Sequence, residues 1–371
     1  MMTTDKLGLY VHIPYCVRKC NYCDFCSLPN GRGEVPDEYI RALCDEIRSY
    51  KGRAYDSLDT VYFGGGTPSL LSPEQLERVM SAARESFVIK PDAEITFEAN
   101  PGTLTKEKAV AFRRLGFNRV SLGLQSIHKN EMKKLGRIHT YQEFLDTFSV
   151  LREVGFDNIS VDLMYGIPHQ TKASFAKTLE AIVALRPEHI SAYGLIVEEG
   201  TPFYDDDDLM LPELDEECDM YELAAAYLRD AGYEHYEISN YARPGYRSRH
   251  NTLYWRFGEY IGVGAAAHSF LGSRRFYNTD SVGEYIMGAG RAIAEDDELD
   301  LAYEYAMLGL RLSEGFSLDE YERLFSVSFT EGKEGIISRL EREGLLTLSD
   351  GRISLTERGF YLSNSILVEI L

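Results

Sequence analysis

Short runs of β-branched and aliphatic residues alternate with amphipathic segments over the first two thirds of the chain. Each run has the length and composition of a buried strand, and the segments between them have helical spacing. The predicted strands span Leu7–Ile13, Thr60–Phe63, Glu94–Glu98, Arg119–Leu124, Asn158–Met164 and His189–Ile196. This alternation predicts parallel strands joined by right-handed helical crossovers.

Helix boundaries in this region carry start signals and a weak repeat. Ser72 to Gln75 has the form of a capping box with proline at the first helical position, and Thr140 with Glu143 repeats the box. Three helix ends share a glycine, an aromatic residue and a following strand, in RRLGFNRVSLGLQS, REVGFDNISVDLMYG and RDAGYEHYEISNYA. A closed barrel uses about eight strand–helix units, and we count about six. Residues 1–204 are therefore predicted to form an α/β fold, an incomplete (β/α)6 barrel.

Polar and glycine-rich segments follow the predicted strands. In chain order they are a group of cysteines, Gly64–Pro68, Asn100–Gly102, Gln125, Tyr165–Pro168 and Glu198–Pro202. Active sites of barrel proteins lie at the carboxyl ends of the strands. The pattern therefore predicts that these segments gather around one cavity.

The last third of the chain does not continue the alternation of predicted strands and helices. An acidic stretch from Asp205 to Glu217 interrupts it, and we interpret residues 205–298 as a connecting segment. Residues 299–371 contain helical segments and the sequence LEREGLLTLSDGRISLTERG, a helix followed by a hairpin that turns at Ser349-Asp350-Gly351. This order resembles a small winged-helix module.

Composition and charge narrow the class of protein. Hydrophobic residues make up 44% and charged residues 26%, which is typical of a globular chain with a sizeable core. The formal charge is −20, which disfavours binding to nucleic acid or anionic lipid. Residues Met1 to Lys6 lack the layout of a signal peptide, and no apolar run reaches the roughly 18 residues of a spanning helix. We therefore expect a cytoplasmic protein with reduced cysteines.

Cys16, Cys20 and Cys23 form a C-x₃-C-x₂-C pattern just after the first predicted strand. Three thiolates could hold a [4Fe–4S] cluster with one iron open to the amino and carboxylate groups of S-adenosylmethionine (SAM). Alternatively, Cys26 could complete a tetrahedral zinc site. The cysteines alone do not separate these alternatives. The neighbouring Asp24-Phe25 and the glycine-rich loop after the second strand favour the cluster, because a structural zinc site needs neither.

Five segments together resemble the radical-SAM group that contains oxygen-independent coproporphyrinogen III oxidase. They are YVHIPYCVRKCNYCDF, YFGGGTPSLL, ITFEANPGT, SLGLQS and VDLMYGIPHQT. The resemblance runs from about residue 7 past residue 202 and continues into the C-terminal module. It implies a [4Fe–4S] cluster on Cys16, Cys20 and Cys23, with SAM as the cofactor beside it.

The resemblance also implies residues that bind SAM. Positions matching those beside the first SAM are Tyr10, Tyr22, Gly65, Gly66, Thr67 and Glu98. Positions matching contacts to a second SAM in the oxidase are Gln125, Arg137 and Asp162. Glycines in the loop after the second strand would let backbone groups approach the ligand closely.

Two features separate the chain from the oxidase pattern. The oxidase has a further cysteine two positions after the third, where this chain has Phe25, and Cys26 follows one position later. The oxidase also carries a longer N-terminal segment over its substrate site, whereas six residues precede the first predicted strand here. Both features weaken the assignment of oxidase activity.

A basic and aromatic segment, Asn240 to Gly258, contains no Asp or Glu. It holds Arg243, Arg247, Arg249 and Arg256, with His250, Tyr246, Tyr254 and Trp255 between them. Arginines bind carboxylates, aromatic faces stack on flat rings and imidazole binds iron, so this composition fits haem. On composition alone, a structural cover over a barrel end is the favoured interpretation.

The order of these residues favours haem. His250-Asn251-Thr252-Leu253-Tyr254-Trp255 resembles the HNxxYW motif of the HemW haem-chaperone branch of the radical-SAM family, which also has the short N-terminus. The resemblance implies that His250 is the axial ligand of the haem iron and that Tyr254 and Trp255 face the macrocycle in a partly open site. His268 is the rival ligand. Cys26 departs from the branch, which typically has Asn there.

The leading hypothesis is a haem chaperone that binds haem, carries a SAM-liganded [4Fe–4S] cluster and delivers haem to acceptor proteins, membrane respiratory enzymes among them. The first alternative is oxygen-independent coproporphyrinogen III oxidase, which decarboxylates propionates in porphyrin biosynthesis. A zinc-stabilised interaction protein is the third. The sequence HNTLYW and the short N-terminus favour the chaperone.

Overall fold

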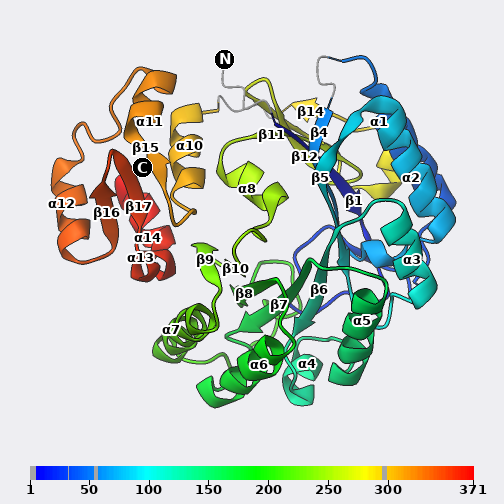
Figure 1. The fold of residues 1–371 in the computed structure, drawn as a ribbon, viewed down its shortest axis with the longest axis horizontal. Helices are drawn as coiled ribbons and strands as arrows, with labels where there is room; N and C mark the ends of the chain where they lie inside the picture. Colours follow the sequence, from blue (N-terminus) through cyan, green and yellow to red (C-terminus); the bar gives the residue numbers. More distant parts are fainter. Residues whose placement is uncertain (1–5, 32, 54–56, 295–298) are drawn as a thin grey trace.

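A single curved sheet organises the computed structural model, which describes residues 6–31, 33–53, 57–294 and 299–371 (Figure 1). The sheet has 12 strands in the order β14-β13-β12-β11-β1-β4-β5-β6-β7-β8-β10-β9. Its centre is a parallel run of β1 (Leu7–Ile13), β4 (Ser57–Gly65), β5 (Val88–Ala99), β6 (Arg119–Gln125), β7 (Ile159–Tyr165) and β8 (His189–Gly194). The predicted incomplete barrel is confirmed, since these strands are the six predicted from the sequence.

Helices cover the convex face of this sheet (Figure 1). They are α1 (Asp37–Ser49), α2 (Pro73–Ser86), α3 (Lys106–Arg114), α4 (Lys129–Lys134), α5 (Tyr141–Glu153), α6 (Lys172–Ala184) and α7 (Leu214–Asp230), with a short 3-10 turn, η1 (Pro68–Leu70), before α2. Both capping boxes predicted from the sequence are present, at Ser72 and Thr140. Between helices and sheet, the Phe97 ring stacks on Phe112 with centroids 3.9 Å apart.

Strands from the segment 205–298, which the sequence suggests to be a connection, lie at both edges of the sheet. At one edge β9 (Glu234–Glu237) and β10 (Asn240–Ala242) continue antiparallel from β8. At the other edge β11 (Glu259–Val263) pairs in parallel with β1, followed by β12 (His268–Leu271), β13 (Arg274–Tyr277) and β14 (Ile293–Ala294). These strands are too short for a clear two-residue period, so the sequence pattern does not reveal them. The short helix α9 (Val282–Ile286) follows β13.

Helix α8 (Arg249–Trp255) lies on the concave side of the sheet, between it and the C-terminal module (Figure 1). The Ser248 hydroxyl caps its first turn by accepting from the backbone N–H of Asn251. The Glu94 carboxylate of β5 accepts the backbone N–H groups of Arg249 and His250 at 2.9 and 3.0 Å. In β1, a Cβ atom at Gly8 would lie 2.8 Å from Leu253 Cδ2, so the absence of a side chain lets the helix approach the sheet.

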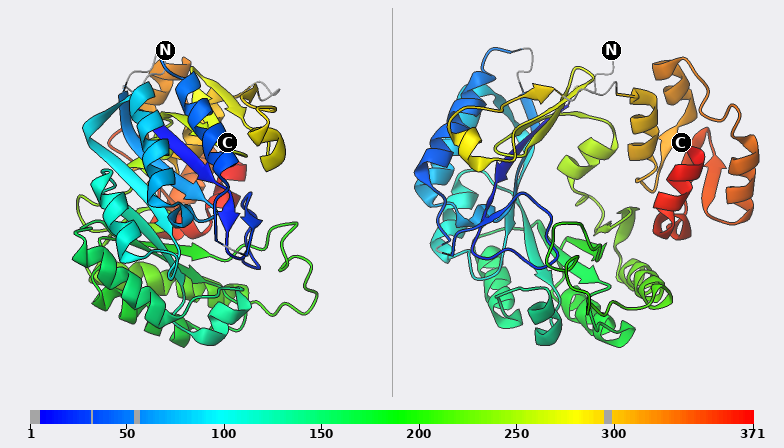
Figure 2. Two further views of the ribbon diagram at one scale, coloured as in Figure 1. Left: turned by 90° about the vertical axis from the view of Figure 1, so that its right-hand side faces the viewer. Right: turned by 180° about the vertical axis from the view of Figure 1, so that it is seen from behind.

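The C-terminal module stands beside the barrel and next to α8 (Figure 2). Its helices are α10 (Leu301–Gly309), α11 (Leu318–Phe325), α12 (Glu334–Arg342), α13 (Glu357–Tyr361) and α14 (Ser363–Ile370). Its strands β15 (Phe316–Ser317), β16 (Leu346–Ser349) and β17 (Arg352–Leu355) form a sheet in the order β15-β17-β16. The order of helices, strand and hairpin confirms the predicted winged-helix-like module.

The hairpin turn of this module is the one predicted from Ser349-Asp350-Gly351. Asp350 and Gly351 both have positive φ, 53° and 70°, as a tight two-residue hairpin requires. The predicted start of the module, residue 299, adjoins residues 295–298, which lie outside the described residues, as do residues 1–5 at the N-terminus. None of the helices in the described part of the chain is both long and apolar enough to cross a membrane.

Candidate metal and cofactor site

A cavity of about 380 Å³ opens at the carboxyl ends of the barrel strands. It is lined by residues that follow β1, β4, β5 and β8, as the sequence pattern predicts, and by residues within β6 and β7. The predicted segment Tyr165–Pro168 is not among its lining residues. Eleven of the residues singled out from the sequence line it: Cys16, Cys20, Cys23, Tyr22, Gly65, Gly66, Thr67, Glu98, Gln125, Arg137 and Asp162. Residues far apart in the sequence thus form one polar wall.

The glycine loop after β4 has no room for side chains on its barrel side. Gly65 has φ of 107°, and a Cβ atom there would lie 2.5 Å from the His12 ring. A Cβ atom on Gly66 would lie 2.7 Å from the carbonyl oxygen of Tyr15, and the Gly66 N–H donates to the Ile13 carbonyl at 2.9 Å. The loop therefore packs its backbone directly against the segment that leads to the cysteines.

Three of the cysteines line the cavity and contact polar partners. Cys16, in the short strand β2 (Tyr15–Cys16) that pairs with β3 (Leu28–Pro29), accepts from the Thr67 hydroxyl at 3.3 Å. Cys20 accepts from Arg137 Nη1 at 3.7 Å. Burial raises the pKa of the Cys16 and Cys23 thiols, while Thr67 for Cys16 and the Phe25 backbone for Cys23 act in the opposite direction. Metal ligation requires the thiolate, which these donors and the Arg137 charge stabilise.

Cys26 is oriented differently. Its thiol donates to the carbonyl oxygen of Asp280 at 3.5 Å, and it is not among the residues that line the cavity. Within the described residues, no group of three or more His, Cys, Asp or Glu side chains is placed to hold a single metal ion. Because Cys16, Cys20 and Cys23 line the cavity and Cys26 does not, the donor set fits a cluster held by three thiolates better than a four-cysteine zinc site.

Two carboxylates belong to the same cavity. Glu98 accepts from the Tyr62 hydroxyl at 2.8 Å and from the Gly65 N–H at 3.2 Å. Burial raises the pKa of Glu98 to about 7, although the Tyr62 hydrogen bond lowers it. Asp162 accepts from the Ser121 hydroxyl at 3.0 Å, and burial raises its pKa too. Buried carboxylates of this kind are suited to holding a cationic group of a ligand.

Three buried polar atoms on the cavity residues have no hydrogen-bond partner within the described structure, Arg137 Nε, Gln125 Oε1 and Ser27 Oγ. The other Arg137 nitrogens are engaged, since Nη2 donates to Asn100 Oδ1 at 2.7 Å and to the Gly123 carbonyl at 2.6 Å. Buried polar groups are normally paired, so an unpaired donor and acceptor here indicate a polar ligand. These residues fit a cofactor that carries amino and carboxylate groups.

Tyr10 is the one predicted SAM residue outside the cavity wall. Its hydroxyl is hydrogen-bonded to His12 Nδ1 at 2.9 Å, and its ring stacks on Tyr62 with centroids 6.2 Å apart. It thus lies behind Glu98 rather than in the cavity.

Conversely, Ser121 and Tyr193 line the cavity but were not predicted from the sequence. Ser121 lies two residues before Gly123 and four before Gln125, so all three face the same side of the strand. This spacing could have identified Ser121 as a cavity residue from the sequence.

The His250 side chain is buried and hydrogen-bonded at both ring nitrogens. The side chain is 1% exposed, and its ring stacks on Tyr62 with centroids 5.0 Å apart. Nδ1 is hydrogen-bonded to the Thr60 hydroxyl at 2.7 Å and Nε2 to the Tyr254 hydroxyl at 2.6 Å. Burial, followed by the Arg119 charge, lowers the pKa of His250 to about 3. The imidazole is therefore neutral, as an iron ligand must be, but both nitrogens already have partners.

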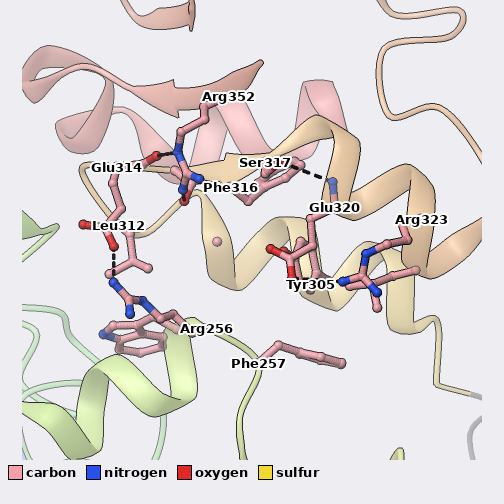
Figure 3. A pocket seen from close by; sticks show the side chains of 14 residues that line it. Arg256, Phe257, Tyr305, Leu312, Glu314, Phe316, Ser317, Glu320, Arg323 and Arg352 are labelled. Carbon is pink, nitrogen blue, oxygen red and sulfur yellow. Dashed lines mark hydrogen bonds and ion pairs between the residues drawn. The ribbon is translucent and has the colours of Figure 1, made fainter. Parts of the chain in front are cut away.

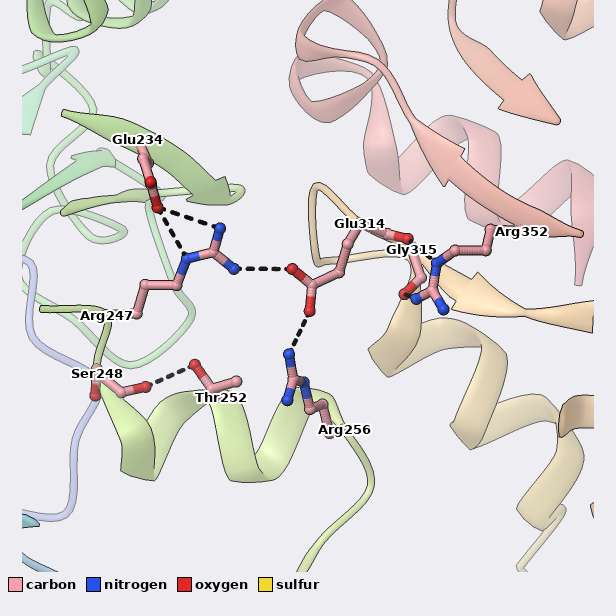
Figure 4. A network of polar contacts seen from close by, with 8 residues as sticks. All are labelled: Glu234, Arg247, Ser248, Thr252, Arg256, Glu314, Gly315 and Arg352. Atoms are coloured by element: carbon pink, nitrogen blue, oxygen red, sulfur yellow. Dashed lines mark hydrogen bonds and ion pairs between the residues drawn. The ribbon is translucent and has the colours of Figure 1, made fainter. Parts of the chain in front are cut away.

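The arginines of the predicted basic segment contact different partners in the folded protein. Arg247 and Arg256 contact Glu314 of the C-terminal module, as Figure 4 shows. Arg249 lies 3.8 Å from an Asp92 oxygen, and Arg243 Nε donates to the Pro187 carbonyl at 3.3 Å. His268, the rival ligand, is an exposed residue at the start of strand β12, with its ring stacked on Tyr277.

Comparison with known proteins identifies the family. The radical SAM superfamily model matches residues 10–182, and the HemN C-terminal domain model matches residues 296–362. The heme chaperone HemW of Lactococcus lactis is 36% identical over 369 residues, covering 98% of this chain and 96% of the relative. That of Escherichia coli is 36% identical over 379 residues, covering 99% and 98%. The chain belongs to the HemW family of radical-SAM proteins.

The HemW family shares its fold with the oxidase to which the sequence also bears a resemblance. The structure of coproporphyrinogen III oxidase from Escherichia coli, a radical-SAM enzyme, matches with a TM-score of 0.85 at 25% identity, over 98% of this chain and 90% of that chain. The predicted membership of the HemW branch is confirmed by the full-length relatives, and the fold class by the structural match. Membership implies a [4Fe–4S] cluster and SAM, for which the cavity residues supply suitable donors.

The position of the cysteines generates a prediction about the cluster. We expect anaerobically reconstituted protein to hold about four irons and four sulfides, and Cys16→Ala, Cys20→Ala or Cys23→Ala to abolish this centre. Cys26→Ala is the matched control and should retain it, because that thiol faces Asp280. Iron, labile sulfide and zinc are measured on each variant. Stoichiometric zinc without labile sulfide in the anaerobically purified parent would contradict the assignment.

The raised pKa of Glu98 generates a prediction about pH. An ionised Glu98 accepts a hydrogen bond from the amino group of SAM, so affinity for SAM should be constant well above pH 7 and fall by up to about tenfold per pH unit below it. Glu98→Gln should bind SAM weakly with little pH dependence. Glu107→Gln, at an exposed carboxylate in α3, should behave like the parent. Equilibrium dialysis of the cluster-loaded protein against SAM measures this, and a pH-independent parent would refute it.

Proposed function

We propose that this protein is a haem chaperone that binds haem, carries a SAM-liganded [4Fe–4S] cluster and delivers haem to acceptor proteins such as membrane respiratory enzymes. The observation that carries the proposal is similarity along nearly the whole chain to proteins named heme chaperone HemW, together with the HNTLYW sequence. The six cysteines are all free of disulfides, which supports the proposed cytoplasmic location.

The cofactor part of the proposal rests on the cavity at the carboxyl ends of the strands. Cys16, Cys20 and Cys23 would hold the cluster, and Glu98 would accept a hydrogen bond from the amino group of SAM. When bound, this pair of cofactors supplies one-electron chemistry. The chain itself contributes the three cysteine sulfurs, the buried carboxylate and Arg137, whose Nη1 donates to Cys20 Sγ at 3.7 Å.

The haem part of the proposal rests on the segment around α8. His250 as axial ligand stays a prediction, since iron would have to replace the Tyr254 hydroxyl at Nε2. Tyr254 and Trp255 would then face the macrocycle. Tyr254 lines a small cavity of about 170 Å³ together with Trp255, Phe257 and Tyr260, so the aromatic side of α8 borders open space.

Oxygen-independent coproporphyrinogen III oxidase is the second candidate, because the solved oxidase matches this fold along nearly all of the chain. The sequence differs from the oxidase pattern at Phe25, where that pattern has a cysteine, and it contains HNTLYW. These differences favour the chaperone.

Haem titration and an oxidase assay on one anaerobically reconstituted sample separate the two candidates. We expect saturable, stoichiometric haem binding with a shifted Soret band, and no conversion of coproporphyrinogen III to protoporphyrinogen above a Cys20→Ala control that lacks the cluster. Robust turnover by the parent would establish the oxidase instead. Absence of haem binding would refute the chaperone proposal directly.

The hydrogen bonds of His250 generate a sharper prediction. Removing the imidazole in His250→Ala should weaken haem binding and alter the Soret spectrum, because it removes the proposed donor to iron. Tyr254→Phe frees Nε2 from its hydroxyl partner, so it should bind haem at least as tightly as the parent. Arg249→Ala and His268→Ala serve as controls, and each should have the smaller effect. An unchanged affinity and spectrum in His250→Ala would refute the axial role.

A further inference from the structure

A second cavity, of about 490 Å³, lies between the end of α8 and the C-terminal module, away from the cysteines (Figure 3). One wall comes from Trp255, Arg256 and Phe257, at the end of α8 and just after it. The opposite wall comes from α10, β15, α11 and β17 of the module. Its volume lies within the range of small-molecule sites, which is roughly 300–1,000 Å³.

Aromatic side chains from both units line this cleft. Trp255 and Phe257 belong to the barrel side, and Tyr305 and Phe316 to the module. Trp255 and Phe257 also line the smaller cavity that contains Tyr254, so the two cavities meet at these residues. Phe257 and Tyr305 contact each other edge to face with ring centroids 6.0 Å apart, and the Arg311 guanidinium lies 4.4 Å over the Trp255 ring. An aromatic ligand would pack against the edge of this cluster.

The cleft also contains positive charge and an unpaired donor. Arg352 donates from Nε to the Glu314 carbonyl and from Nη2 to the Gly315 carbonyl, both at 2.9 Å, so the partners it has there are neutral. Arg323, on α11, is exposed and lies 3.3 Å from Glu320. Trp255 Nε1 is buried with no hydrogen-bond partner in the described structure. These groups fit carboxylates, which accept from guanidinium and indole N–H groups.

Several contacts hold the two walls in place. The Glu314 carboxylate joins Arg247 and Arg256 of the α8 region, with N···O distances of 2.8 and 2.5 Å (Figure 4). Beside it, the Ser313 N–H donates to the Tyr236 carbonyl at 3.0 Å. The two units that form the cleft are therefore joined directly at Ser313 and at Glu314, and Glu314 also lines the cleft.

We propose that this cleft binds the carboxylate-bearing part of a flat aromatic macrocycle, with Arg323 and Arg352 of the C-terminal module as its anion-binding residues. That the macrocycle is haem rests on the proposed function. The module thereby supplies the carboxylate recognition, and the α8 side supplies aromatic contact. Recognition through carboxylates and ring faces does not require iron, so an iron-free porphyrin uses the same residues.

The test compares three probes on full-length, cluster-loaded protein: haem, metal-free protoporphyrin IX and its dimethyl ester, in which both carboxylates are blocked. The variants are Arg323→Gln, Arg352→Gln, their combination and Arg352→Lys. Arg342→Gln is the matched control, because Arg342 is an exposed arginine of the same module that donates to Ser338 within its own helix. Circular dichroism and the melting temperature verify folding.

The double variant should bind haem and metal-free protoporphyrin about tenfold or more weakly than the parent, since each lost charged hydrogen bond costs about that factor. Arg352→Lys should retain part of the affinity, and Arg342→Gln all of it. The dimethyl ester should bind weakly to every variant alike. If the Arg352 variants fail to fold, Arg323→Gln alone should still weaken the free acids and not the ester.

Two outcomes would overturn the inference, and they are distinguishable. Folded Arg323→Gln and double variants that bind both free acids as tightly as the parent would show that the macrocycle binds elsewhere, while the proposed function stands. A parent that binds none of the probes would refute the proposed function and the inference together. Equal binding of ester and acid by the parent would also refute carboxylate recognition.

Discussion

Burial of helix α8 against the concave face of an open sheet is the contact on which the rest of the structure depends. An incomplete barrel cannot close its interior with strands alone, so another element must cover the inner side chains. Helix α8 does so, held by the Glu94 carboxylate, which accepts two backbone N–H groups from its first turn. Gly8 of β1 leaves the space that Leu253 fills. Because the helix is fixed at this end, His250 points into the barrel while Trp255 reaches the cleft beside the C-terminal module.

Tyr62 of β4 connects the cofactor cavity with helix α8. Tyr62 donates its hydroxyl to Glu98 of the cofactor cavity, and its ring stacks on His250 of α8. One aromatic residue thus positions a carboxylate on one side and an imidazole on the other. The cavity at the carboxyl ends of the strands contains thiols, carboxylates and glycine backbone, whereas the cleft beside α8 contains aromatic rings and arginines. This difference in chemistry matches a small zwitterionic cofactor in the first and a flat carboxylated ligand in the second.

Folding pairs arginines of the basic segment with carboxylates from distant parts of the chain. The segment from Asn240 to Gly258 contains only basic charges, yet Arg247 and Arg256 are neutralised by Glu314, which comes from the C-terminal module. The module brings its own arginines to the same place, and Arg352 contacts carbonyl groups there instead of carboxylates. In the cleft, Arg352 of the module therefore contacts neutral carbonyl groups, whereas Arg256 at the end of the basic segment is paired with the Glu314 carboxylate.

The central strands, the capping boxes, the hairpin at Asp350 and the cysteine loop can be predicted from the sequence alone, because each depends on residues within a few positions of one another. The sequence also determined the family, since ordered short motifs survive along nearly the whole chain. Only the tertiary structure decided which partners these residues meet. His250 bonds Thr60, 190 positions earlier, and Cys26 bonds Asp280, 254 positions later. Local periodicity carries no information on such pairs, because packing of distant elements selects them. The cleft between α8 and the C-terminal module likewise cannot be predicted from the sequence, because its two walls come from segments that only tertiary packing brings together.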